Sequence, residues 1–185
     1  LYQFIWKDYC DWYIEFTKPI LNNSSNIEFL NETKNISINI MEKVLLMLHP
    51  IMPYLTEEIF EKLFQSSQLV ISSLWPQKIK SNKSLRNGID LLIKLVSTLR
   101  SIRVEKNIPS KSRPIIFLKN IDLEKRKIID ENKNLIINLA KLNEIKFSLV
   151  KEEFENDKFI ITTIDEITLM ISLDGLIDTE NERSR

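Results

Sequence analysis

The chain has 185 residues, which is enough for one full domain, or for one domain with a small appendage, and its 43% hydrophobic and 28% charged residues are ordinary for a soluble globular protein. A single cysteine, Cys10, excludes an internal disulfide and indicates a reducing, cytoplasmic setting, and with only one histidine beside it zinc has no plausible ligand set. No apolar run approaches the roughly 20 residues that span a bilayer, so we expect no membrane partner.

The formal net charge is zero, but the charges are unevenly distributed. Residues 78–113 are strongly basic, with Asp90 and Glu105 as their only acidic members, whereas acidic residues dominate beyond residue 151. One part of the molecule is therefore expected to attract phosphate and another to repel it.

Residues 1–17 predict a helix with a broad aromatic face. We expect Trp6, Trp12 and the tyrosines to lie in a bundle core, as large aromatic side chains usually do. The alternative is a stacking platform for bases, which requires one exposed ring. Pro19 is expected to end this helix before a polar loop over residues 22–26.

A second helix is predicted from about residue 31 to His49, followed by a sharp corner and a third helix to about Phe64. Pro50 cannot continue a helix, whereas Pro53 suits the first turn of a new one. Thr56 is a possible cap, and His49 is expected to bond a carbonyl at its helix end and to have no catalytic role. Residues 73–76 are expected to be extended, with Trp75 buried over the bundle.

A fourth helix is predicted over residues 84–105. Its apolar stripe consists of Leu91, Leu92, Leu95, Leu99 and Ile102. Arg86, Arg100 and Arg103 fall on a neighbouring arc, and residues 107–113 extend the same positive charge. A charged helix face is usually only solvated, but this continuation favours a ridge that binds phosphate.

The pattern changes after Pro114. Residues 115–118 and 145–150 predict strands around a helical segment over residues 122–142, with a possible break near Glu131, and residues 159–164 and 167–173 predict a hairpin across Asp165 and Glu166. The expected fold is mainly α: an up-down helical bundle over residues 1–110, followed by a small α+β subdomain over 111–177. Residues 178–185 are expected to begin a helix that is cut off, and Leu1 to open inside one, as in a fragment of a longer chain.

Several motifs together resemble the C-terminal part of the valyl-tRNA synthetase family. In chain order they are Tyr9-Cys-Asp-Trp-Tyr-Ile-Glu15, Leu48-His-Pro-Ile-Met-Pro-Tyr-Leu-Thr-Glu-Glu-Ile59, Leu74-Trp-Pro76, Leu99-Arg-Ser-Ile-Arg-Val-Glu-Lys-Asn-Ile-Pro109 and Gly175-Leu-Ile-Asp178. Isoleucyl, leucyl and methionyl enzymes share the helical domain, but the combination of motifs favours the valyl member. The resemblance covers nearly the whole chain.

The resemblance implies a parent enzyme that attaches valine to tRNA(Val) with ATP and magnesium. The sequence contains neither the HIGH nor the KMSKS signature of such catalytic domains, so we expect this piece to need no cofactor and to be catalytically inactive by itself. The implied partners are tRNA(Val) and the catalytic domain of the same chain, and a monomer is expected.

The leading hypothesis is a module that holds the anticodon stem-loop of tRNA, whose unpaired bases can be splayed out and stacked. The residues predicted to bind tRNA are Arg86, Lys94, Arg100, Arg103, Lys106, Lys111 and Arg113. The alternative is a helical scaffold or protein-interaction domain with little direct RNA contact, which predicts an exposed apolar patch instead. An enzyme in its own right is disfavoured, because no nucleophile motif, metal set or phosphate loop is present.

Overall fold

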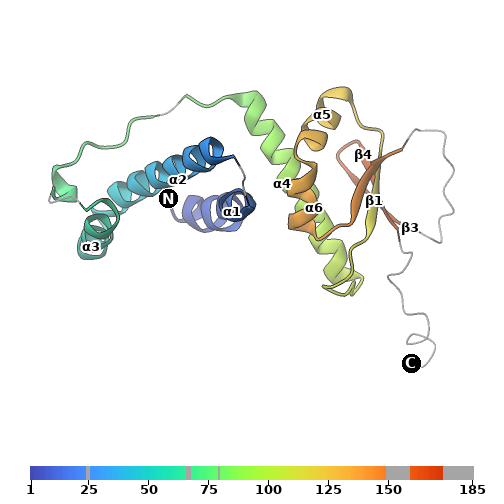
Figure 1. Ribbon diagram of the computed structural model, residues 1–185, viewed down its shortest axis with the longest axis horizontal. Helices are drawn as coiled ribbons and strands as arrows, with labels where there is room; N and C mark the ends of the chain where they lie inside the picture. The colour runs from blue at the N-terminus through green and yellow to red at the C-terminus, as the bar shows by residue number, and fades with distance from the viewer. Residues whose placement is uncertain (24–25, 66–67, 79, 149–158, 173–185) are drawn as a thin grey trace. The chain divides into compact units, whose positions relative to one another are not determined.

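The computed structural model describes the chain except for residues 24–25, 66–67, 79, 149–158 and 173–185. The chain divides into two units, Leu1–Lys80 and Ser81–Arg185 (Figure 1). The described residues of the first unit form helices and connecting segments, whereas the second unit combines helices with a four-stranded sheet. The expected class, mainly α with a small α+β part, is confirmed. The predicted segment from residue 178 lies outside the described residues, as do most of the acidic residues beyond 151.

The N-terminal helix is longer than predicted. A π-helix, η1 (Phe4–Tyr13), continues directly into α1 (Ile14–Asn23), and Pro19 lies inside α1. The prediction that Pro19 ends the helix was wrong. Proline removes one backbone hydrogen bond and bends a helix, but the turns on either side of it can still form.

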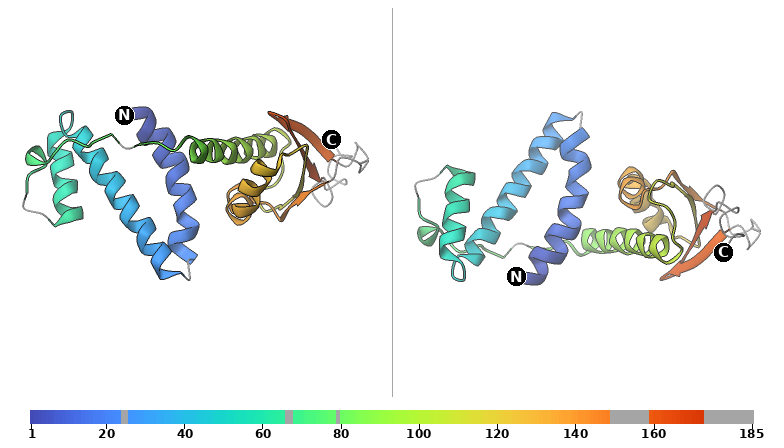
Figure 2. Two further views of the ribbon diagram at one scale, coloured as in Figure 1. Left: turned by 90° about the horizontal axis from the view of Figure 1, so that it is seen from above. Right: turned by 90° about the horizontal axis from the view of Figure 1, so that it is seen from below.

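Helix α2 (Ile27–Leu48) begins before the predicted residue 31, because Asn26 caps it by accepting a hydrogen bond of 3.1 Å from the Phe29 backbone N–H. Figure 2 shows η1 and α1 meeting α2 as a helical hairpin. The hydroxyls of Tyr13 and Ser37 lie 3.0 Å apart and link its two arms. Ile36 of α2 is exposed.

The predicted helix–corner–helix is confirmed: α2 ends at Leu48, and α3 (Pro53–Phe64) has Pro53 in its first turn. A short 3-10 helix, η2 (Val70–Ser72), packs against α3. The core at this corner consists of Leu45, Phe60 and Val70.

Three local predictions at the corner were wrong. Thr56 does not cap α3: it is 1% exposed, and its hydroxyl bonds the carbonyls of Met52, the residue before α3, and of Pro53. His49 contacts the same hydroxyl, where a carbonyl was expected. Trp75 is 63% exposed. Val70 fills the core instead, because its backbone N–H is anchored by the Glu57 carboxylate at 3.1 and 3.2 Å.

The second unit is built on α4 (Lys83–Glu105), which matches the predicted fourth helix. The Asn82 side chain caps it by accepting from the backbone N–H groups of Ser84 and Leu85. All members of the predicted stripe are buried. They face α5 (Leu123–Glu131) and α6 (Lys133–Ala140), which are separated at Asn132, close to the predicted break.

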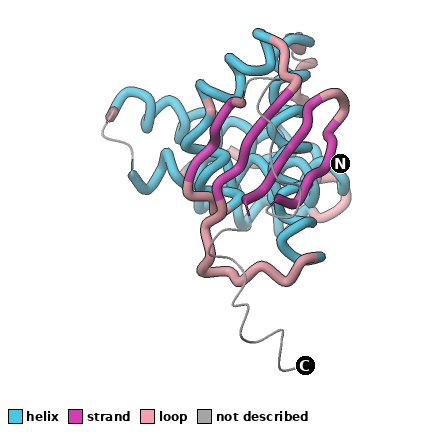
Figure 3. The backbone as a smooth tube through the Cα atoms, turned by 90° about the vertical axis from the view of Figure 1, so that its right-hand side faces the viewer, coloured by secondary structure: helices cyan, strands magenta, loops and turns pink. Residues whose placement is uncertain are grey.

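The sheet has the order β2-β1-β4-β3 (Figure 3). Its strands are β1 (Ile115–Lys119), β2 (Glu144–Phe147), β3 (Phe159–Ile164) and β4 (Ile167–Ser172). Strands β1 and β2 are parallel, because α5 and α6 form the crossover between them, whereas β4 runs antiparallel to both β1 and β3. The predicted hairpin is confirmed, with Asp165 in the left-handed region at its turn.

Candidate nucleic-acid interface

Helix α4 carries four of the residues predicted to bind tRNA, and its length keeps them apart. At 1.5 Å per residue, Arg86 in the first turn and Arg103 in the last lie about 25 Å apart along the axis. Arg86 therefore belongs to a different part of the surface from Arg100 and Arg103, and Lys94 lies between them along the helix.

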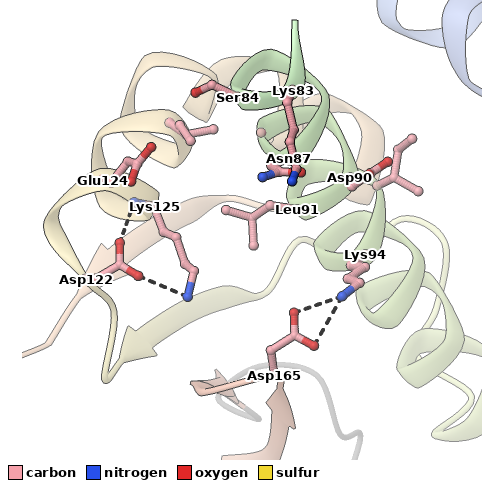
Figure 4. Close-up of a pocket in the computed structure, with 13 residues that line it drawn as sticks. Lys83, Ser84, Asn87, Asp90, Leu91, Lys94, Asp122, Glu124, Lys125 and Asp165 are labelled. Atoms are coloured by element: carbon pink, nitrogen blue, oxygen red, sulfur yellow. Dashed lines mark hydrogen bonds and ion pairs between the residues drawn. The ribbon is translucent and has the colours of Figure 1, made fainter. Parts of the chain in front are cut away.

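Lys94 borders a cavity of about 710 Å³ between the first half of α4, α5 and the β3–β4 turn (Figure 4). Its Nζ atom lies 2.9 Å from Asp165 Oδ2, and Lys125 Nζ lies 2.9 Å from Asp122 Oδ2. The hydrogen bond to Asp122 raises the pKa of Lys125. Because Lys94 and Lys125 both meet carboxylates, this mixed-charge cavity is poorly suited to phosphate.

Arg103 joins three chain segments at the end of α4. Its Nη1 donates to the Lys141 carbonyl at 3.2 Å, and its Nη2 donates to the carbonyls of Pro109 and Ser112 at 2.9 Å each. Burial, and then the nearby charge of Arg113, lowers the pKa of Arg103, but a guanidinium stays charged at neutral pH. Arg103 thus shapes this surface as well as charging it, so removing it is expected to disturb the fold.

Arg100 lies one turn earlier on α4, and its Nε donates to the Leu139 carbonyl at 3.1 Å. Both arginines line a second cavity, of about 570 Å³, where α4 and α6 end. Val104, Ile108, Leu139 and Ala140 supply its apolar wall. No acidic side chain is among the described residues that line it. We call this cavity the α4–α6 pocket.

The remaining predicted residues follow α4. Lys106 caps the helix and pairs with Glu105 at 3.0 Å, while Lys111 and Arg113 are exposed in the segment leading to β1. The structure thus gathers Arg100, Arg103 and Arg113 at one end of the unit. Sequence reasoning missed Lys141, which lines the α4–α6 pocket. The one feature of the sequence that could have pointed to Lys141 is its place, as a basic residue near the end of a predicted helix.

The aromatic residues of η1 divide between core and surface. Tyr9 is buried, as predicted, and Trp12 is partly buried. The core prediction was wrong for Trp6 and Tyr2, which are 64% and 77% exposed and whose rings stack on each other with an interplanar angle of 4°. An exposed pair of parallel rings meets the condition stated for a base-stacking platform.

Two further observations concern the described part of the chain. It contains no group of three or more His, Cys, Asp or Glu side chains placed to hold a metal ion. Among its helices, none combines the length and the apolar character needed to cross a bilayer.

Comparison with known proteins identifies one matching family. The family model for the anticodon-binding domain of tRNA ligase matches residues 1–119, which include η1 to β1. All the residues predicted to bind tRNA lie inside this match, whereas Lys141 lies outside it.

Relatives match over the full length of the chain. It is 33% identical over 191 residues to a valine–tRNA ligase of Buchnera aphidicola subsp. Schizaphis graminum and 32% identical over 189 residues to one of Zymomonas mobilis. A valine–tRNA ligase of Legionella pneumophila strain Lens is 33% identical over 193 residues. The matches cover 100% of this chain but only 20–21% of each relative, so the chain spans about a fifth of their length.

Proposed function

Because the chain belongs to the family of anticodon-binding domains of tRNA ligases, we propose that it binds the anticodon stem-loop of tRNA(Val) as a module of a valine–tRNA ligase. The family match over residues 1–119 carries this proposal. It covers both the exposed Tyr2 and Trp6 rings and the basic end of α4.

The proposed RNA contacts follow from the charges and their partners. Arg100, Lys111 and Arg113 are the main candidates for the phosphates, because all three are exposed in the last turns of α4 or in the segment that follows it. Lys94 and Lys106 are weaker candidates, because each is paired with a carboxylate. Arg86 would contact a more distant part of the RNA. Arg103 contributes charge while holding three carbonyls in place.

In this proposal, the ATP-dependent attachment of valine belongs to the parts of the ligase beyond this chain, which match no residue here. ATP with magnesium would be held there. The described residues offer no cluster of side chains for a metal ion, and we assign the basic end of α4 to the nucleic-acid backbone. We further propose that the chain contributes to the ligase as a monomer.

The test is a gel shift of the 185-residue chain against valine and isoleucine tRNAs at two salt concentrations. The expected result is a shift with the valine tRNA that weakens steeply at the higher salt, because several phosphates are neutralised. The chain should bind the isoleucine tRNA with lower affinity than the valine tRNA. No shift with either tRNA at low salt would contradict the proposal.

A specific observation favours a second candidate, a scaffold that packs against the catalytic domain of the same ligase. Large apolar side chains are exposed around the start of α3, where Tyr54 is 91% and Ile51 is 73% exposed. Such a surface is typical of one that a partner covers. The two functions are compatible, and the gel shift separates them, since a scaffold alone gives no salt-sensitive RNA complex.

A further inference from the structure

We propose that the α4–α6 pocket holds one unpaired nucleotide of the bound RNA, with Lys141 and Arg100 at its phosphate and Val104, Ile108 and Leu139 against its base. This inference rests on the proposed function and deepens it: it adds Lys141 and Leu139, which lie outside the family match, and it names the chemical group that is bound. It is argued from four features of the second unit.

The pocket is built by two helix ends of the same type. At the end of α4, Asn107 has a positive φ of 51°, its N–H bonds the Val104 carbonyl and the Ile108 N–H bonds the Arg103 carbonyl. At the end of α6, Lys141 has a φ of 53°, and the N–H groups of Lys141 and Leu142 bond the carbonyls of Asn138 and Ile137. Both are Schellman motifs, which end a helix sharply and place its last turn at the pocket wall.

The charge balance favours an anion despite the helix ends. Each helix C-terminus carries about half a negative charge, so the two together contribute about one. Arg100, Arg103 and Lys141 line the pocket with three positive charges, and Arg113 lies close enough to affect Arg103. The arginines also donate to carbonyls at these ends, which reduces the exposed negative charge. The pocket therefore remains positive.

Lys141 occupies a backbone position that favours another residue. A left-handed residue at this place in a Schellman motif is usually glycine, because a Cβ atom makes that conformation unfavourable. At the end of α4 the same place is taken by asparagine, which tolerates it better than most residues. A lysine here is unfavourable for the fold, and it places a cation at the pocket. An unfavourable backbone position of this kind is typical of a functional residue.

The size and the walls of the pocket fit a nucleotide and not a bare phosphate. Its volume of about 570 Å³ lies in the range typical of small-molecule sites. Val104, which is 77% exposed, lies at its edge, and the partly exposed Ile108 and Leu139 offer a surface against which a base can pack. The larger cavity beside Lys94 lacks this combination, because carboxylates share its lining.

The test measures fluorescence anisotropy of two RNAs with the 185-residue chain: a hairpin with an unpaired loop, and a fully paired duplex with the same number of phosphates. The variants are Lys141→Gly, Lys141→Asn and Lys141→Arg, with Lys127→Ala on α5 as a matched loss of one exposed lysine. Thermal unfolding is measured on each variant. Glycine and asparagine suit the backbone at 141, so neither variant should lower the Tm.

The pocket predicts that Lys141→Gly and Lys141→Asn weaken hairpin binding about tenfold, which corresponds to one lost charge-assisted contact, and lower the salt dependence by about one ion. Duplex binding should hardly change, Lys141→Arg should retain the affinity, and Lys127→Ala should behave as the unsubstituted chain. An equal loss on hairpin and duplex, or no loss on either, overturns the nucleotide pocket while the chain still binds RNA. Failure of the unsubstituted chain to bind either RNA overturns the proposed function itself.

Discussion

The Nδ1 atom of His49 lies 2.8 Å from Thr56 Oγ1, and this contact joins the end of α2 to the first turns of α3. The same hydroxyl lies 2.9 Å from the Met52 carbonyl and 3.1 Å from the Pro53 carbonyl. A hydroxyl has one proton, so when Thr56 donates it to a carbonyl, Nδ1 must carry the proton that His49 donates to Thr56. A hydrogen bond between the side chains of His49 and Thr56 thus connects the two helices across the corner that contains Pro50 and Pro53.

We expect Thr56→Val to destabilise the first unit by about 1–2 kcal/mol, because it removes these bonds from a buried site. A double-mutant cycle with His49→Ala should give a coupling energy of about 1 kcal/mol, measured by urea denaturation. The matched control is Thr33→Val, which removes a buried threonine hydroxyl in α2 that donates to the Phe29 carbonyl. Thr33→Val and His49→Ala should be additive. Additive effects of Thr56→Val and His49→Ala would contradict the contact.

Arg103→Lys is expected to lower the stability of the second unit by about 1–2 kcal/mol. A lysine keeps the charge but cannot reach the Lys141, Pro109 and Ser112 carbonyls at once, since that requires the planar guanidinium. The midpoint of urea unfolding should fall while its slope stays the same. Arg86→Lys, on an exposed turn of the same helix, serves as the control and should leave the midpoint unchanged. An unchanged midpoint for Arg103→Lys would show that the guanidinium hydrogen bonds to the three carbonyls are dispensable for stability.

Asp122 should make the stability of the second unit depend on pH. Its carboxylate caps α5, and the hydrogen bond that it accepts from the Lys125 backbone N–H, at 2.7 Å, is the main cause of its lowered pKa. A lowered folded-state pKa means that the stabilisation is present above the ordinary pKa of aspartate and is lost as the pH falls through the folded value.

The measurement is the Tm of the chain and of Asp122→Asn across the acidic range. Asparagine still caps the helix but does not titrate there, so the advantage of the unsubstituted chain should be present at neutral pH and shrink on acidification. The pKa of Lys125 is raised, so the stabilisation that its charge contributes should be lost only as the pH rises through its own folded-state pKa. A Tm difference that is constant from acid to neutral pH would argue against a role for the Asp122 charge.

Gly88→Ala should stabilise the second unit by about 0.5–1 kcal/mol, because glycine in the interior of a helix is entropically costly. Gly88 lies inside α4, and a Cβ atom there would meet Ile128 Cδ1 at 3.5 Å, an ordinary contact distance. Thermal unfolding measures the gain. Gly88→Leu is the matched opposite: its larger side chain must displace Ile128 and should lower the Tm. A lower Tm for the alanine variant would mean that α4 and α5 pack more tightly there than the structure indicates.

Helices and strands that depend on local patterns were predictable. The buried stripe of α4 follows from apolar residues spaced at the helical period, and the β3–β4 hairpin follows from two runs rich in Ile and Thr on either side of Asp165 and Glu166. The corner at Pro50 and Pro53 follows from the backbone chemistry of proline. In each case the determining residues are neighbours in the sequence. Pro19 was misjudged because a proline can also bend a helix without ending it.

The amino-acid sequence by itself determined the helical class, the order of the elements, the basic character of residues 78–113 and the family resemblance, because all of these reside in residue types and their spacing. Only the tertiary structure decided which cations share one surface. It separated Lys94, which pairs with Asp165, from Arg100, and it brought Lys141 to the end of α4. The physical reason is that a side chain's partners come from segments distant in the chain, and folding alone decides whether a charge meets a carboxylate, a carbonyl or an open pocket.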